Sequence, residues 1–146
     1  MAAPGRAQES REERAAGYLE RGDRLFKREA YQEALAPYRQ AEELLDGDPV
    51  ILKRIGITLA RAGKYARAVD YLEPLRVAGD TAGLYVTYYL GVARQELGQY
   101  EPALAMYRSC LEQVGGEARP GDLEELEERI AYTGFMKELA ETPLEV

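Results

Sequence analysis

The sequence contains no histidine and a single cysteine, Cys110, among its 146 residues. The absence of histidine removes the commonest general base, the commonest metal ligand and the usual switch near neutral pH. One cysteine cannot form an intrachain disulfide or a thiolate metal cluster, so we expect neither a metal nor a cofactor. The two serines, Ser10 and Ser109, have no histidine to activate them, and no phosphate-binding loop occurs. These absences indicate that the protein is not an enzyme.

Long apolar runs are also missing. No stretch approaches the roughly 18 apolar residues that a membrane-spanning helix needs. Residues 1–16 carry charges where a secretory signal needs an apolar segment. The sequence therefore predicts a cytoplasmic location without membrane insertion.

The net charge of −7 is concentrated at one end of the chain. Residues 1–111 hold 16 acidic and 16 basic side chains, whereas residues 112–146 hold 10 acidic and 3 basic ones. A nucleic-acid binder shows a net basic face, so we expect no nucleic-acid partner. An acidic run of this kind is typical of a solvated helix face.

What the chain does contain is an internal repeat. A glycine is followed nine residues later by a tyrosine, twelve later by an alanine and sixteen later by a large apolar residue, and the three glycines are 34 and 35 positions apart. The three sets are Gly22, Tyr31, Ala34, Tyr38; Gly56, Tyr65, Ala68, Leu72; and Gly91, Tyr100, Ala103, Tyr107. Periods of this length mark stacked supersecondary units, which present a surface to another chain.

Local signals place the helix boundaries within this repeat. Ser10 followed by Glu13 is a capping-box pattern and predicts the start of a helix. Asp48 before Pro49 predicts another start, because proline lacks an N–H that the first helical position leaves unpaired in any case. Gly63 predicts a helix end. We expect each of the three repeated units to contain two helices, the second of which begins near Tyr31, Tyr65 or Tyr100.

The repeated residues resemble the tetratricopeptide repeat (TPR), a helix-turn-helix unit of about 34 residues. The resemblance implies an all-α fold, a right-handed α-solenoid of three helix-turn-helix repeats with a C-terminal capping helix. The expected organisation is a flexible N-terminal segment at 1–9, three repeats within 10–117 (about 15–48, 49–83 and 84–117), and a loop, capping helix and C-terminal tail at 118–146.

The sequence departs from the family pattern in a few places. Thr87 and Arg94 stand in the third repeat where the other repeats have apolar residues, so we expect its first helix to pack least regularly. Glu29 stands where the other two repeats end their first helix with a glycine. One extra residue is expected within 78–83.

In the family the first helices line the concave side, so the resemblance implies a partner-binding groove made of first-helix positions that packing does not use. The central repeat offers basic residues there, and the third offers three tyrosines on one helical face. A row of tyrosines suits a recognition surface, and it suits the core equally well. The groove candidates are Leu19, Asp23, Phe26, Lys27, Lys53, Arg54, Ile57, Arg61, Tyr85, Tyr88, Tyr89, Val92 and Glu96.

In the C-terminal segment, Asp122 followed three residues later by Glu125 resembles a capping box and predicts the start of a last helix. We expect this helix to reach about Glu141. One side of this helix carries Leu123, Leu126 and Ile130, which we expect to pack on the last repeat. The nearly opposite side carries Tyr132, Phe135, Met136 and Leu139, a possible second interface.

Three functional hypotheses follow. The first is a non-catalytic cytoplasmic adaptor or scaffold that binds a peptide or protein segment in its concave groove. The second is a chaperone for a secreted substrate, similar to the small three-repeat chaperones of bacterial type III secretion, which are also short, acidic and cytoplasmic. The third is a structural module that docks or forms a homo-oligomer through its C-terminal helix.

A role beside heat-shock chaperones is disfavoured. Family members grip the acidic tails of those chaperones with a clamp of lysine, asparagine and arginine. The corresponding sites hold Leu19, Asp23, Tyr85 and Tyr89 here.

Overall fold

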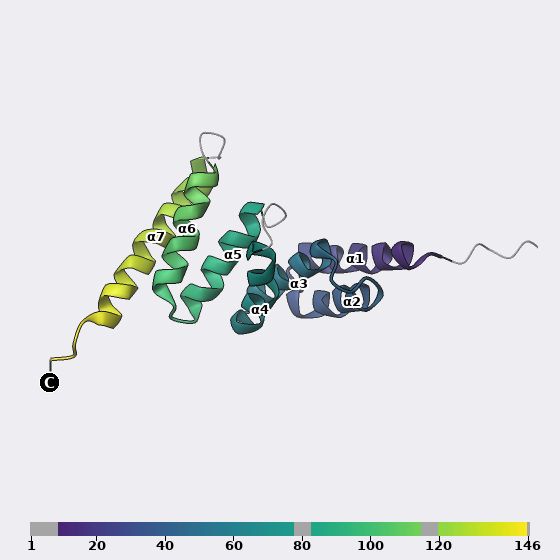
Figure 1. The fold of residues 1–146 in the computed structure, drawn as a ribbon, viewed down its shortest axis with the longest axis horizontal. Coiled ribbons are helices and arrows are strands. Elements are labelled where there is room, and N and C mark those ends of the chain that lie inside the picture. The colour runs from purple at the N-terminus through teal and green to yellow at the C-terminus, as the bar shows by residue number, and fades with distance from the viewer. Residues whose placement is uncertain (1–8, 78–82, 115–119, 146) are drawn as a thin grey trace, which may run out of the picture.

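The computed structural model describes residues 9–77, 83–114 and 120–145, and these residues form seven helices and no strand (Figure 1). The helices are α1 (Arg11–Lys27), α2 (Tyr31–Leu44), α3 (Pro49–Arg61), α4 (Tyr65–Val77), α5 (Gly83–Glu96), α6 (Tyr100–Val114) and α7 (Pro120–Glu141). None of the helices in the described part of the chain has the length and apolar character needed to cross a membrane. The expectations for residues 1–8, for an extra residue at 78–82 and for the loop at 115–119 concern positions outside the described ranges.

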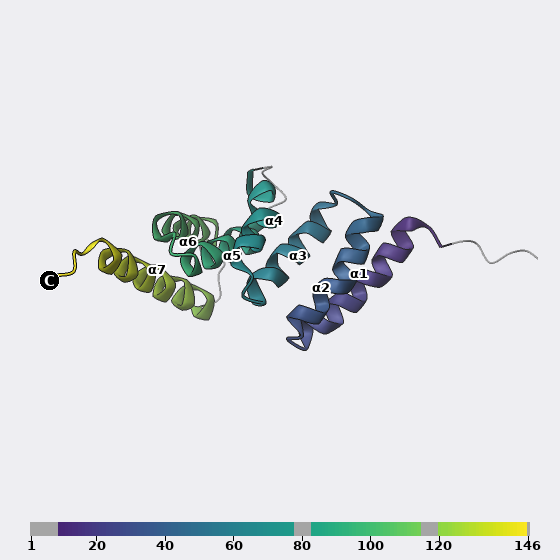
Figure 2. The ribbon, with the colours of Figure 1, turned by 90° about the horizontal axis from the view of Figure 1, so that it is seen from below.

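The helices follow one another as a stack of pairs. Figures 1 and 2 show α1 and α2 at one end of the long axis and α6 and α7 at the other, with α3, α4 and α5 between them. The second helix of each pair begins at Tyr31, Tyr65 and Tyr100, as the repeat predicts. The expected all-α arrangement of three helix pairs and a terminal helix is confirmed.

Two of the predicted helix starts rest on the side-chain bonds that the sequence suggested. The Ser10 hydroxyl accepts a bond from the Glu13 N–H at 3.1 Å, and the Glu13 carboxylate accepts one from the Ser10 N–H at 2.8 Å. The Asp48 carboxylate accepts bonds from two N–H groups of the first turn of α3, at 2.9 and 3.1 Å. The predicted start of the last helix at Asp122 is wrong, because α7 begins at Pro120, where the missing N–H of proline costs nothing.

The three glycines of the repeat are points of close approach between helices. An added Cβ at Gly22 would lie 2.3 Å from the Tyr38 ring, and one at Gly56 would lie 2.4 Å from the Leu72 side chain. At Gly91 the nearest atom is in the Tyr107 ring, at 2.7 Å. The sixteen-residue spacing therefore records a contact in which a large side chain of the second helix lies against bare backbone of the first.

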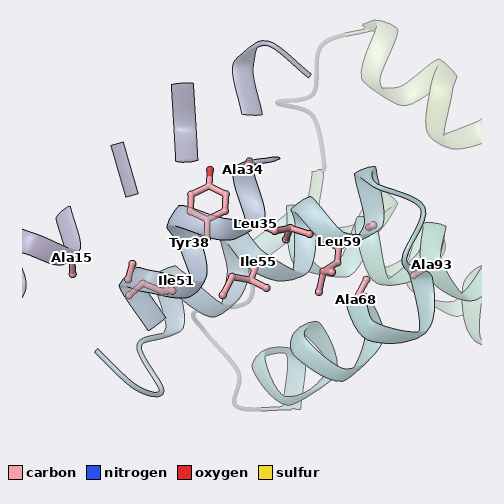
Figure 3. Close-up of a cluster of buried hydrophobic side chains, with 11 residues drawn as sticks. Ala15, Ala34, Leu35, Tyr38, Ile51, Ile55, Leu59, Ala68 and Ala93 are labelled. Carbon is pink, nitrogen blue, oxygen red and sulfur yellow. The ribbon is translucent and has the colours of Figure 1, made fainter. Parts of the chain in front are cut away.

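The core is a series of clusters along the stack. In the first two repeats, Leu35 and Tyr38 of α2 pack with Ile51, Ile55 and Leu59 of α3, and all five side chains are buried (Figure 3). A second cluster joins α4 to α5, and a third joins α6 to α7. Each pair of helices is thus packed against its neighbours in sequence, as expected of a repeat stack.

The two polar departures of the third repeat find polar partners. Thr87 is buried, and its hydroxyl donates to the Gly83 carbonyl at 3.4 Å. The Arg94 guanidinium lies 3.1 Å from the Glu73 carboxylate on α4 and donates to the Gln99 side chain at 2.8 Å. Repeat packing here relies partly on an ion pair between α4 and α5.

Substituting Gly22 by alanine should destabilise the fold by about 1–3 kcal/mol, because the Tyr38 ring is buried and cannot retreat from the new methyl group. Gly17 provides the matched control on the same helix. No atom lies within 4 Å of a Cβ added there, so Gly17→Ala should stabilise the fold by up to about 1 kcal/mol. Urea unfolding measures the change in stability of both variants. Equal changes in the two would contradict a close contact between Gly22 and the Tyr38 ring.

Glu29→Gly should stabilise the fold by about 0.5–1 kcal/mol, because Glu29 has φ +59°, a left-handed conformation that costs a side chain energy. Gly63 occupies the corresponding turn with φ +76°, so Gly63→Ala should be destabilising by a similar amount. Thermal unfolding compares the two variants. A loss of stability in Glu29→Gly would show that the weak contact of this carboxylate with Arg61, at 4.0 Å, outweighs the backbone strain.

Candidate functional site

A pocket of about 660 Å³ lies between the first helices of the last two repeats and the terminal helix. Its walls come from α3, α5 and α7 and from the C-terminal end of α6. The lining residues are Ala60, Arg61, Leu84, Tyr85, Tyr88, Tyr89, Val92, Cys110, Gln113, Val114, Asp122, Glu125, Leu126 and Arg129. We refer to this set as the tyrosine pocket.

The three tyrosines of α5 divide between pocket and core. Tyr85 is 61% exposed. Tyr88 and Tyr89 are half-buried and meet edge to face, with ring centroids 5.2 Å apart. Tyr88 packs on the last core cluster and Tyr89 on the first two. The sequence left open whether these residues belong to the core or to a surface; two of them serve both, and Tyr85 lies on the surface.

The wall formed by α7 is tied to Tyr88. The Tyr88 hydroxyl donates to the Glu125 carboxylate at 2.5 Å, and the Arg129 guanidinium lies 5.4 Å from the centre of the Tyr88 ring. Arg129 also contacts Glu125 at 3.4 Å. Burial, together with the bond to Glu125, raises the pKa of Tyr88, so this phenol remains a neutral hydrogen-bond donor. The contacts hold α5 and α7 at a fixed separation across the pocket.

Each basic residue of α3 contacts a carboxylate or a tyrosine of a neighbouring helix. The Arg54 guanidinium lies 3.1 Å from the Asp23 carboxylate, which also accepts a bond from the Tyr38 hydroxyl at 2.7 Å. Arg61 donates to the Tyr31 hydroxyl and lies 4.8 Å from the centre of that ring. The Lys53 ammonium lies 5.9 Å from the Tyr85 ring centre.

Lys53 makes no ion pair with another described residue, unlike Arg54 and Arg61. It is therefore the cation of α3 that is most available to a ligand.

The structure brings together part of the predicted groove. Arg61, Tyr85, Tyr88, Tyr89 and Val92 line the tyrosine pocket. Three of the remaining candidates pack on the core instead, namely Leu19, Phe26 and Ile57. Two others, Lys27 and Glu96, are exposed on α1 and α5 and lie outside the pocket lining.

Sequence reasoning missed the contribution of α7 to this site. Glu125 and Arg129 line the pocket, and they lie four residues apart on one side of the helix. Tyr132 follows one turn later on the same side. This spacing of four and three residues was the sequence signal that these side chains share one face of α7. What could not be known from the sequence is which neighbouring helix this side faces.

Cys110 is among the residues that line the pocket and is 1% exposed. Burial raises the pKa of its thiol to about 11, so the sulfur remains protonated near neutral pH. Its weak bond to the Leu84 carbonyl, at 3.9 Å, joins α6 to the start of α5. This cysteine acts as a packing residue.

A buried polar cluster holds the pocket walls together. The Gln95 side-chain oxygen on α5 accepts bonds from the Tyr107 hydroxyl of α6 at 2.8 Å and from the Thr133 hydroxyl of α7 at 3.1 Å. Thr133 and Tyr107 are fully buried and Gln95 is 8% exposed. Burial raises the pKa of Tyr107 to about 12. One amide thus links the last three helices, and it places α7 beside α5.

Replacing Gln95 with leucine should destabilise the fold by about 1–3 kcal/mol, since two buried hydroxyl groups lose their acceptor. Gln113→Leu, at an exposed position of α6, is the matched control and should have little effect. Urea unfolding supplies both values. A cost no larger for Gln95→Leu than for the control would show that the cluster does not fix α7.

No protein-family model and no curated protein matches the sequence. Solved structures do match the fold. The crystal structure of the Sgt2 TPR domain from Aspergillus fumigatus has a TM-score of 0.69 and 20% identity, covering 90% of this chain and 87% of that one. The NMR structure of the first TPR domain of the human RPAP3 protein has a TM-score of 0.63 and 23% identity, covering 83% and 95%. The chain therefore has the tetratricopeptide-repeat fold, an α-solenoid of three helix-turn-helix repeats with a C-terminal capping helix.

Proposed function

We propose that the chain is a non-catalytic protein–protein interaction module that holds a segment of a partner protein in the groove formed by α3, α5 and α7. In the cell it would act as a cytoplasmic adaptor or scaffold. The observation that carries this proposal is the tyrosine pocket, an open cavity with an aromatic wall on the side of the first helices. The resemblance to tetratricopeptide repeats supports it, because that family presents the same helix faces to its partners.

The size and chemistry of the pocket suit a few side chains of a partner segment. Its volume of about 660 Å³ falls within the range of about 300–1,000 Å³ typical of ligand pockets. Tyrosine offers a large rigid contact area at a low cost in conformational entropy, and a hydroxyl that bonds polar groups. A large apolar side chain of the partner would lie against Tyr85, Tyr88 and Val92.

Contacts within the chain fix the side chains of the pocket walls. Tyr88 is bonded to Glu125 and covered by Arg129, and Tyr89 is half-buried in the core. A site whose side chains are fixed beforehand loses less entropy when it binds. Lys53, beside the exposed Tyr85 ring, is placed to meet a carboxylate of the bound segment.

The double variant Lys53→Ala/Tyr85→Ala tests the groove without disturbing the core, since Tyr85 is 61% exposed and Lys53 makes no ion pair with another described residue. Proteins that the wild-type chain captures from a lysate, quantified by mass spectrometry, should be reduced about tenfold or more by this variant. Arg108→Ala, an exposed position of α6, also removes one positive charge and should leave capture unchanged. Identical captured sets from all three chains would sink the groove proposal.

A further inference from the structure

The terminal helix α7 carries an exposed apolar stripe outside the tyrosine pocket. Tyr132, Phe135 and Leu139 are 54%, 60% and 56% exposed. They follow one another at intervals of three and four residues, so they lie on one side of the helix over about 10 Å. Met136, beside them, is partly buried. We call Tyr132, Phe135 and Leu139 the α7 stripe.

The α7 stripe continues the wall of the pocket. Glu125, Arg129 and Tyr132 are spaced by four and three residues, and the first two line the pocket against Tyr88. The stripe therefore begins one turn beyond the pocket and runs on toward the C-terminal end of the helix. Large apolar residues exposed in a row in this way are typical of a protein contact surface.

The charges around the stripe that form no ion pair with a described residue are acidic. Glu128 lies four residues before Tyr132 on the same side, and Glu138 follows Phe135 by three residues. Both are exposed, and neither forms an ion pair with another residue of the described ranges. Residues 112–146 as a whole hold 10 acidic and 3 basic side chains. An approaching partner therefore meets an apolar row flanked by unpaired carboxylates.

These charges argue against a second copy of the chain as the occupant. Two copies meeting through α7 would bring both sets of carboxylates together, and each copy has a net charge of −7. Like charges placed across an interface cost binding energy, whereas complementary charges speed the encounter and select the partner.

We propose that the α7 stripe binds a basic amphipathic helix of a partner protein. Apolar side chains of that helix, at spacings of three and four residues, would pack on Tyr132, Phe135 and Leu139 in the manner of helices in contact. Its lysine or arginine side chains would pair with Glu128 and Glu138 at the edges. This surface is separate from the pocket residues on which the proposed function rests.

The probe is a fluorescein-labelled peptide of about 15 residues, with leucines spaced three and four apart and lysines elsewhere, titrated into the full chain by fluorescence anisotropy. Phe135→Ala/Leu139→Ala should weaken its binding about tenfold or more. Glu128→Gln/Glu138→Gln should weaken it several-fold at low salt and reduce its salt dependence. A second peptide with glutamates in place of the lysines should not bind.

Matched variants separate this surface from general stickiness or net charge. Val50→Ala/Leu97→Ala removes apolar side chains that are 55% and 40% exposed elsewhere, and Glu33→Gln/Glu43→Gln removes two exposed carboxylates of α2. Both should bind the lysine peptide as wild type does. Equal losses in these variants, or equal binding of the glutamate peptide, would overturn the proposal.

Light scattering tests whether a second copy of the chain occupies the α7 stripe instead. A wild-type dimer that Phe135→Ala/Leu139→Ala converts to a monomer would assign the stripe to a second copy and would also overturn the proposal. The groove variant Lys53→Ala/Tyr85→Ala should bind the lysine peptide normally. Failure of the groove proposal and failure of the stripe proposal are thus seen in different variants.

Discussion

The contact between a glycine of the first helix and the large side chain sixteen residues later is the constraint on which the whole stack depends. A methyl group at Gly22 or Gly91 would force the two helices of a repeat apart. Each pair also packs on the next, so the displacement would pass along the stack. Tyr38 and Tyr107 add a hydroxyl bond to the first helix of their own repeats, and this bond fixes the orientation of the ring as well as the spacing.

The last helix of the stack, α7, is held in place without a close glycine contact. Gly134 lies in α7, and a Cβ added there would meet no described atom within 4 Å, in contrast to the glycines of the repeats. The adjacent Thr133 is buried and bonds to Gln95, so α7 is held to the last repeat by a polar contact together with Leu126. A helix fixed along one side only keeps its other side open. The large apolar side chains of that side are therefore exposed.

The helix boundaries could be predicted from the sequence because the groups that set them lie close together in the chain. Ser10 and Glu13 are three residues apart, and their bonds need no tertiary structure. The charge of the groove could not be predicted in the same way. Arg54 forms an ion pair with Asp23, and Arg61 donates a hydrogen bond to Tyr31. The partners in each contact are about thirty residues apart, so these contacts depend on how α3 packs against α1 and α2. The part of the pocket formed by α7 was missed for the same reason, because residue spacing within α7 does not say which helix it faces.

The pocket lies where the third repeat breaks the apolar pattern, and the two facts are connected. Arg94 turns toward Glu73, and Thr87 fills less volume than leucine, so large side chains of the groove face supply packing in this repeat. Tyr88 and Tyr89 do this and form the pocket wall at the same time. In the proposed groove, these two rings would therefore serve both packing and recognition. Tyr85 and the α7 stripe are largely exposed and contribute little to the core, so substitutions there should change a bound partner without loss of the fold.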